Sequence, residues 1–108
     1  MEVKSVGEVK IAVIPARVDA NSAKDVETKL NEIVGGGARK LVCDFSGNDY
    51  ISSAGLRVFL SMLKQMQKNG GKIVLCQMKP YVREVFDMAG FSQLFQIYTT
   101  ENDAVTNV

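Results

Sequence analysis

Two neighbouring serines, Ser52 and Ser53, are the residues of this sequence best placed to do chemistry. They lie in the stretch DYISSAGLRVF, residues 49–59, between two apolar segments. A serine at a helix start can cap the helix, because its hydroxyl accepts from a backbone N–H two or three residues on. A phosphate there would face unpaired N–H groups and the positive end of the helix dipole, so the helix would tolerate it. It would still add about −1.5 to −2 charges to any docking surface. The stretch by itself leaves both roles open.

The rest of the residue inventory removes many kinds of catalysis. The chain has no histidine, which excludes Ser-His-Asp and Cys-His catalysis and the common zinc sites. Cys43 and Cys76 each lie in a strongly apolar run and form no C-x-x-C pair, which predicts buried free thiols. Asp44 and Asp49 have no second acidic cluster beside them, so we expect strand-end or turn roles for them. We therefore expect neither a metal nor a cofactor.

The composition is that of an ordinary folded domain. The chain has 108 residues, 46% of them hydrophobic and 23% charged, which fits one domain over residues 1–108. Its net charge is +1 and it has no basic block, so nucleic acid is not an expected partner. No stretch resembles a signal peptide or reaches the roughly 18 apolar residues of a membrane span. We expect a cytoplasmic protein with no membrane contact.

The first third of the chain predicts a strand and a helix. Apolar and polar residues alternate over residues 9–13, as in a strand with one wetter face, and MEVKS before Gly7 predicts a preceding hairpin strand. From Ala23 onward, the spacing of apolar residues predicts a helix, with Ser22 and Asp25 expected to form a capping box. The three glycines at 35–37 end this helix and, without a following G-K-[ST], do not indicate a phosphate loop.

The centre of the chain predicts a βαβ unit with parallel strands. KLVCDF (residues 40–45) and KIVLCQM (residues 72–78) are short continuous apolar runs that suit strands covered on both faces. Between them we expect a helix of about 16 residues. Its predicted apolar stripe consists of Leu56, Phe59, Leu60, Leu63 and Met66. The methionines Met62, Met66 and Met88 are expected to fill the core.

The last third predicts a further helix after Pro80 and a short strand. Val82, Val85, Phe86 and Ala89 are expected to form the apolar face of that helix, which ends at Gly90. LFQIYT predicts a short strand and ENDAVTNV a frayed terminal turn. The expected fold is therefore α/β, with a four- or five-stranded, partly parallel mixed sheet and three or four helices. Polar turns at residues 17–21, 44–53 and 78–81 fall at the carboxyl ends of strands, where ligands of such sheets gather.

The segment LVCDFSGNDYISSAGLRVFLSMLKQMQKNGGKIVLCQM resembles the core of the STAS domain found in bacterial anti-sigma factor antagonists. ARVDANSA resembles that family's G-R-L-D-A stretch, with Ala16 in place of its usual glycine. VREVFDMAGFSQLFQIYTTENDAV resembles the family's C-terminal part. The resemblance runs from about Val9 to Val105 and implies a single STAS domain.

The resemblance implies a non-enzymatic partner switch. Such an antagonist binds an anti-sigma factor serine kinase while it is unphosphorylated, which releases the sigma factor. Phosphorylation of a serine at a helix N-terminus ends that binding, and a separate PP2C-type phosphatase restores it. The family pattern D-S-[ST]-G-L, aligned on Gly55 and Leu56, implies phosphorylation at Ser53, with Ser52 in the acid's place as an alternative acceptor. The expected partner-binding residues are Asp19, Asn21, Ser52, Ser53, Ala54 and Arg57.

Two other interpretations remain open at this point. The chain could be the STAS subunit of a lipid transport complex or of a larger signalling scaffold, where the serines would be interface or cap residues. It could also be a small α/β enzyme or nucleotide binder, although it has no histidine, phosphate loop or paired acids to support that reading.

Overall fold

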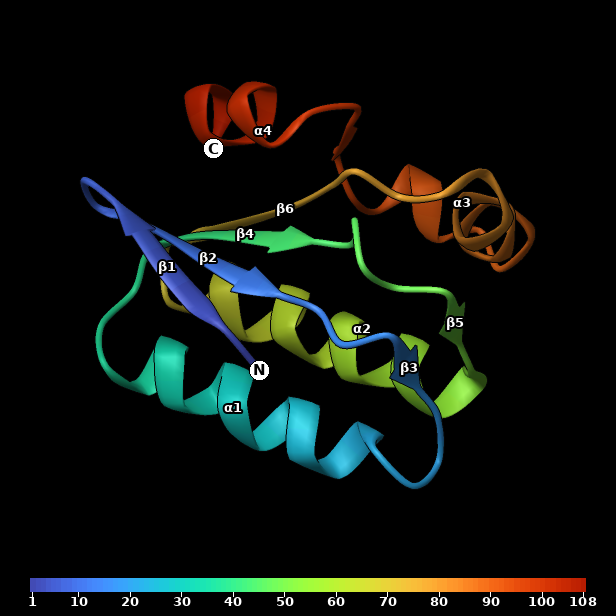
Figure 1. The fold of residues 1–108 in the computed structure, drawn as a ribbon. Coiled ribbons are helices and arrows are strands. Elements are labelled where there is room, and N and C mark those ends of the chain that lie inside the picture. Colours follow the sequence, from blue (N-terminus) through green and yellow to red (C-terminus); the bar gives the residue numbers. More distant parts are fainter.

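A five-stranded mixed sheet forms the centre of the protein (Figure 1), seen in a computed structural model that describes all residues 1–108. The strand order is β1-β2-β4-β6-β7, and a separate two-stranded sheet pairs β3 with β5. The strands of the large sheet are β1 (Val3–Val6), β2 (Val9–Val13), β4 (Lys40–Asp44), β6 (Lys72–Cys76) and β7 (Ile97–Tyr98). The helices are α1 (Ala23–Gly35), α2 (Ser53–Lys68), α3 (Pro80–Met88) and α4 (Glu101–Asn107), with a 3-10 turn η1 (Phe91–Gln93). This confirms the predicted α/β class and the mixed sheet.

The predicted hairpin at the start of the chain is present. β1 pairs with β2 antiparallel, with Val6 opposite Val9. Gly7 between them has φ +58°, in the left-handed region that two-residue hairpin turns require and that glycine adopts without a Cβ penalty. β1 is exposed along its whole length, and it ends the sheet on that side.

The inner strands are parallel, as the βαβ pattern predicts. β2 pairs with β4, β4 with β6 and β6 with β7, all in parallel. Their side chains alternate between the two faces of the sheet, so the adjacent residues Val42 and Cys43 belong to different apolar clusters. Both faces are therefore covered, which is why these strands are nearly continuous apolar runs.

The larger core lies between the sheet and helices α1, α2 and α3. Figure 1 shows α1 and α2 running side by side below the sheet and α3 at its edge. Aromatic rings fill the part of this core near α3, where Phe45 lies 5.2 Å from Phe59 and 5.7 Å from Phe86, measured between ring centroids. No helix combines the length and the apolar character that a membrane crossing needs.

Helix α2 has the predicted length, but its buried stripe is turned from the predicted one. The residues of α2 that are buried are Gly55, Val58, Phe59, Met62 and Met66. Leu56, Leu60 and Leu63 are only half-buried, on the flank of the stripe. Gly55 belongs to this buried face, where it lies against the side chains of Val18 and Ile51.

The prediction that Met88 and Ala89 are core residues is wrong. Met88 is 82% exposed and Ala89 is exposed, whereas Val82 and Phe86 are buried as expected and Val85 is half-buried. Met88 follows Phe86 by two residues, about 200° around the helix, so it lies on the face opposite the buried one. Ala89 is the C-cap residue, one position beyond the helix.

The terminal segment ENDAVTNV is a packed helix and not a frayed turn. The Thr100 hydroxyl caps α4 by accepting from the N–H of Asp103 at 3.0 Å. Ala104, fully buried, packs with the smaller apolar cluster on the opposite face of the sheet from α1 and α2. Lys4 of β1 forms an ion pair with Glu101 at 3.1 Å. The small side chain at 104 lets this short helix lie close against the strands.

Candidate functional site

A small parallel sheet brings the two main candidate segments together. β3 (Arg17–Val18) pairs with β5 (Tyr50–Ile51), with Val18 opposite Ile51. The next residues along the two strands are Asp19 and Ser52, and the N–H of Ser52 donates to the carbonyl of Val18 at 2.9 Å. The structure therefore places the polar turn after residue 17 beside the serine pair. Sequence patterns did not predict this second sheet, because strands of two residues carry no periodicity.

The two serines have different surroundings. Ser52 is the N-cap of α2, with extended backbone, and its hydroxyl accepts from the N–H of Gly55 at 3.3 Å. Ser53 is the first residue of the helix, is exposed, and its hydroxyl makes no hydrogen bond to another residue. The capping role therefore belongs to Ser52, and the Ser53 hydroxyl is accessible at the positive end of the helix dipole.

Gly55 allows the first turn of α2 to lie against the small sheet. A Cβ at this position would lie 2.7 Å from the Ile51 side chain, 2.8 Å from that of Val18, and 3.0 Å from the Val18 carbonyl oxygen. Ala54 beside it is half-buried and packs against the core. The small residues after the serine pair thus fix the distance between α2 and the strands that precede Asp19 and Ser52.

Asp19 closes the turn that leads into helix α1, and the predicted capping box of Ser22 and Asp25 is wrong. The Asp19 carboxylate accepts from the N–H groups of Asn21 at 2.9 Å and Ser22 at 3.1 Å. The Ser22 hydroxyl makes no cap bond but donates to the carbonyl of Arg17 at 3.0 Å. Both amides precede Ala23, the first helical residue, so the Asp19 carboxylate stabilises the turn and does not cap the helix.

The backbone hydrogen bond from Asn21 holds the pKa of Asp19 below its ordinary value, with a further contribution from Ser22. The second carboxylate oxygen lies 3.5 Å from Nε of Arg17, and the side chain of Asp19 keeps 26% of its surface exposed. Asp19 is therefore charged and reachable from solvent. Asn21 is also exposed and lies on the same turn.

Several cationic side chains surround the start of α2. Arg57 is exposed, lies one turn after Ser53 on the same helix, and forms no ion pair. The Arg17 guanidinium lies over the ring of Tyr50, 4.6 Å from its centroid. Lys79, from the third polar turn, pairs with Asp49. All three predicted turns thus contribute to this edge of the molecule.

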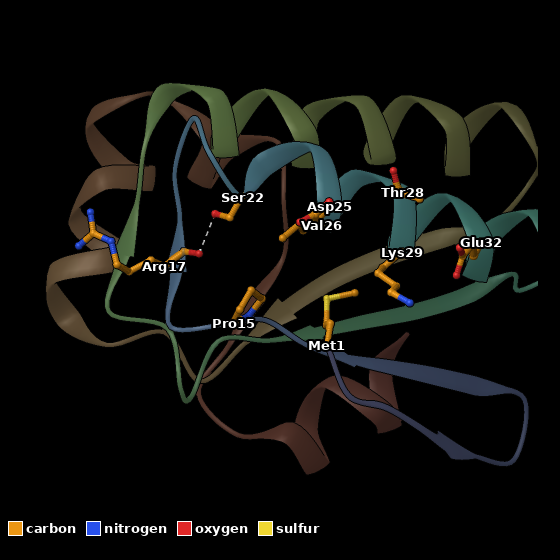
Figure 2. A pocket seen from close by; sticks show the side chains of 9 residues that line it. All are labelled: Met1, Pro15, Arg17, Ser22, Asp25, Val26, Thr28, Lys29 and Glu32. Carbon is orange, nitrogen blue, oxygen red and sulfur yellow. Dashed lines mark hydrogen bonds between the residues drawn. The ribbon is translucent and has the colours of Figure 1, made fainter.

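A hollow of about 450 Å³ lies beside this site, between α1 and the start of the chain (Figure 2). Its wall includes Arg17 and Lys29, but also the acids Asp25 and Glu32, so the charges balance. Figure 2 shows the Arg17 guanidinium pointing away from the hollow. Only two of its nine lining residues are hydrophobic, whereas small-molecule sites are mostly apolar. The hollow does not have the lining of a cofactor pocket.

The other candidate residues have structural roles. The buried Asp44 carboxylate accepts from the N–H of Ser46 at 2.8 Å and from the side chain of Gln77 at 3.2 Å, which is the predicted strand-end role. Cys43 and Cys76 are buried free thiols, as predicted. Burial raises the pKa of Cys43 well above its usual range, and burial followed by the nearby Asp44 raises the pKa of Cys76 to about 12. Neither thiol has the character of a nucleophile. No three potential metal-ligating side chains lie together.

One residue that sequence analysis missed is Asn48, which is fully buried beneath the site. Its side-chain nitrogen donates to backbone carbonyls of both segments that carry the candidate residues. In the sequence it stands in the turn-like run SGND, where nothing distinguishes a buried asparagine from an exposed one.

The fold and the site define a small α/β domain that displays a serine hydroxyl at the start of its central helix. The chain belongs to the STAS domain family, whose model matches residues 1–104. It is 42% identical over 94 residues to BtrV of Bordetella bronchiseptica, a candidate anti-sigma factor antagonist, covering 87% of this chain and 81% of that protein.

Solved structures share the fold at lower sequence identity. A candidate anti-sigma factor antagonist from Thermotoga maritima has a TM-score of 0.92 and 23% identity, covering 99% of this chain and 92% of that one. The anti-sigma factor antagonist SpoIIAA in its unphosphorylated form has a TM-score of 0.83 and 19% identity, covering 96% and 91%. The phosphorylated form of SpoIIAA from Bacillus has a TM-score of 0.75 and 19% identity, covering 97% and 96%. These similarities establish the fold alone.

Proposed function

We propose that this protein is an anti-sigma factor antagonist that is switched by phosphorylation of Ser53. In its unphosphorylated form it binds an anti-sigma factor that is also a serine kinase, so that the sigma factor is released. That kinase phosphorylates Ser53 and the complex separates, after which a PP2C-type phosphatase restores the binding form. The protein itself has no catalytic role in this cycle. The name of BtrV and the solved phosphorylated form of SpoIIAA support this proposal.

The observation that carries the proposal is the division of labour between the two serines. Ser52 already satisfies the cap of α2, so the hydroxyl of Ser53 is not needed by the fold. Ser53 is exposed, its hydroxyl makes no hydrogen bond to another residue, and it is the first residue of the helix. A kinase can therefore reach it without opening the structure, and Ser52, whose oxygen is engaged and half-buried, is the poorer acceptor.

A phosphate on Ser53 would leave the domain folded. It would add about −1.5 to −2 charges at the positive end of the helix dipole, where an anion contributes stability and does not remove it. Arg57 stands four residues further on, exposed and unpaired, and such i,i+4 pairs contribute about 0.2–0.5 kcal/mol. The phosphate would instead weaken binding of the partner, because a partner bound to this surface would have to desolvate the added dianion.

The surface offered to the anti-sigma factor combines the start of α2 with the turn after β3. Asp19 is charged, partly exposed, and held by the small sheet beside Ser52. Asn21, Ala54 and Arg57 border the same area. We expect basic groups of the partner to contact Asp19, and its nucleotide-binding edge to face Ser53.

The test compares single-charge substitutions of two exposed serines. Ser53→Asp adds a negative charge at the proposed switch, whereas Ser5→Asp adds the same charge to an exposed residue of the hairpin strand β1. Wild type and both variants are used as bait in extracts of the native cell. We expect wild type and Ser5→Asp to retain an anti-sigma factor with a kinase domain, identified by mass spectrometry, and Ser53→Asp to lose it.

The captured partner is then incubated with the purified protein and ATP. Wild type should gain the mass of one phosphate, mapped by fragmentation to Ser53, and Ser53→Ala should gain none. Equal retention of the partner by Ser53→Asp and wild type would overturn the proposal. Capture of a transporter ATPase or a signalling scaffold instead of an anti-sigma factor would also overturn it, in favour of another STAS assembly.

A further inference from the structure

The side chain of Asn48 connects the two segments that carry the candidate site. Asn48 lies in the link between β4 and β5 and is fully buried. Its side-chain nitrogen donates to the carbonyl of Pro15 at 2.8 Å and to that of Tyr50 at 3.1 Å. Pro15 precedes β3 and Tyr50 belongs to β5, so a single amide bridges the entrances to both strands of the small sheet.

Few backbone hydrogen bonds join the two segments that the Asn48 side chain connects. The carbonyl of Ala16 accepts from the N–H groups of Asp49 at 2.8 Å and Tyr50 at 3.3 Å. The short β3–β5 ladder and the bond from Ser52 to Val18 are the other backbone hydrogen bonds between the two segments. The Asn48 nitrogen also donates to the Ala16 carbonyl, at 3.4 Å. The two segments are therefore joined by a few hydrogen bonds, and Asn48 supplies the side-chain part of them from inside the core.

The oxygen of the same amide, Oδ1, is buried and accepts no hydrogen bond from another group of the chain. The opposite orientation of the amide is excluded, because its nitrogen faces backbone carbonyls, which bond only to a donor. What the asparagine provides at this place is donation from one side chain to backbone carbonyls of two segments.

We propose that Asn48 is a positioning residue for the phosphorylation-controlled surface. It holds the turn that carries Asp19 at a fixed distance from Ser52 and Ser53, so that one partner meets both at once. Asn48 is fully buried, so it acts only through the backbone segments it joins. The functional part rests on the proposed function above, whereas the positioning itself is a property of the free protein and can be tested without any partner.

The test measures amide hydrogen exchange in Asn48→Ala and in a matched core variant, Val42→Ala. Val42 is also fully buried, but it lies in β4 and packs on the opposite face of the sheet, under α4. In Asn48→Ala we expect the amides of Ser52 and Asp49 to exchange at least about tenfold faster relative to the β2–β4 ladder. In Val42→Ala the ratio between these two groups of amides should stay as in wild type.

Binding of the anti-sigma factor captured in the preceding experiment is the second measurement. At a temperature where both variants are folded, Asn48→Ala should bind at least about tenfold more weakly than Val42→Ala, although both lose core contacts. If Asn48→Ala does not fold, Asn48→Ser replaces it, because a hydroxyl retains one donor in a smaller volume. We expect Asn48→Ser to show the same local change in exchange, reduced in size.

The outcomes separate this proposal from the proposed function. Uniform exchange throughout Asn48→Ala, or an unchanged ratio at Ser52, would overturn the positioning role whatever the partner is. A local exchange change with binding equal to that of Val42→Ala would show that the surface does not depend on the position of Asp19, and would also overturn it. Failure to capture any anti-sigma factor would overturn the proposed function and leave the exchange result to decide the role of Asn48.

Discussion

Replacing Gly55 with alanine tests whether the close contact between α2 and the small sheet determines the local structure. The two effects of this change have opposite signs. Alanine favours a helix over glycine by about 0.5–1 kcal/mol. The new methyl group, however, would lie under 3 Å from side-chain carbons of Val18 and Ile51 and 3.0 Å from the Val18 carbonyl oxygen. Overpacking of this kind costs about 1–3 kcal/mol.

The steric effect should prevail because part of the obstacle is backbone. The Val18 carbonyl cannot move away freely, since it accepts the hydrogen bond from Ser52. We therefore expect Gly55→Ala to lower the free energy of unfolding by about 1–2 kcal/mol, which corresponds to a fall in Tm of about 5–15 °C in a domain of this size. Urea unfolding followed by circular dichroism measures this directly, and the chain has no tryptophan for fluorescence.

Gly35→Ala is the matched control. Gly35 is also helical, in α1, but nothing lies within 4 Å of the position its Cβ would take. This variant should be at least as stable as wild type, because only the propensity effect remains. If Gly55→Ala were as stable as Gly35→Ala, the argument that contact with Val18 and Ile51 sets the position of α2 would be wrong.

Two further predictions concern packing and pH. Met62→Ala should lower the free energy of unfolding by about 2–5 kcal/mol, because Met62 is fully buried. Met88→Ala should change it by less than about 0.5 kcal/mol, because Met88 is 82% exposed. Urea titrations of both variants measure these changes. The pKa of Asp19 is lowered in the folded state, chiefly by the backbone hydrogen bond from Asn21. The charged carboxylate therefore stabilises the folded protein at pH values above the unfolded pKa of about 4. This stabilisation is lost as the pH falls through the folded pKa. Asp19→Asn keeps an oxygen acceptor but removes the charge, so its Tm should fall less than that of wild type between about pH 5 and pH 2, and parallel curves would contradict the reasoning.

The regular elements of the fold followed from the sequence because their residues repeat with a clear period. The continuous apolar runs that became β4 and β6, and the helix between them, are long enough for burial on both faces to leave a pattern. Resemblance to a known family selected Ser53 as the proposed phosphorylation site, whereas the pattern of polar residues alone left capping and phosphorylation open for both serines. The division of roles between Ser52 and Ser53 needed coordinates, because both are serines and only one hydroxyl lies within reach of Gly55.

The parts that sequence analysis missed depend on contacts between distant segments. The pairing of β3 with β5 joins two-residue strands, which have no period to detect. The packing of α4 depends on Ala104, whose fit against the other face of the sheet cannot be predicted from a local pattern. The exposure of Met88, in contrast, follows from its place on the face of α3 opposite Phe86. Ser22 and Asp25 form no capping box, because the Ser22 hydroxyl donates to the Arg17 carbonyl and the Asp19 carboxylate accepts from the amides of the turn before α1.

The sparse bonding between β3 and β5 also bears on when the protein becomes recognisable during its synthesis. The hydrogen bond from Asn48 to Pro15 joins residues 33 positions apart. Closing such a loop lowers the chain entropy before the new contacts can offset the loss. The hairpin and the local helical turns can form earlier, so a nascent or partly unfolded chain would carry Ser53 without the neighbouring surface that displays it. Under the proposed function, binding of an anti-sigma factor would then require these long-range contacts, and a partly unfolded copy would not bind it.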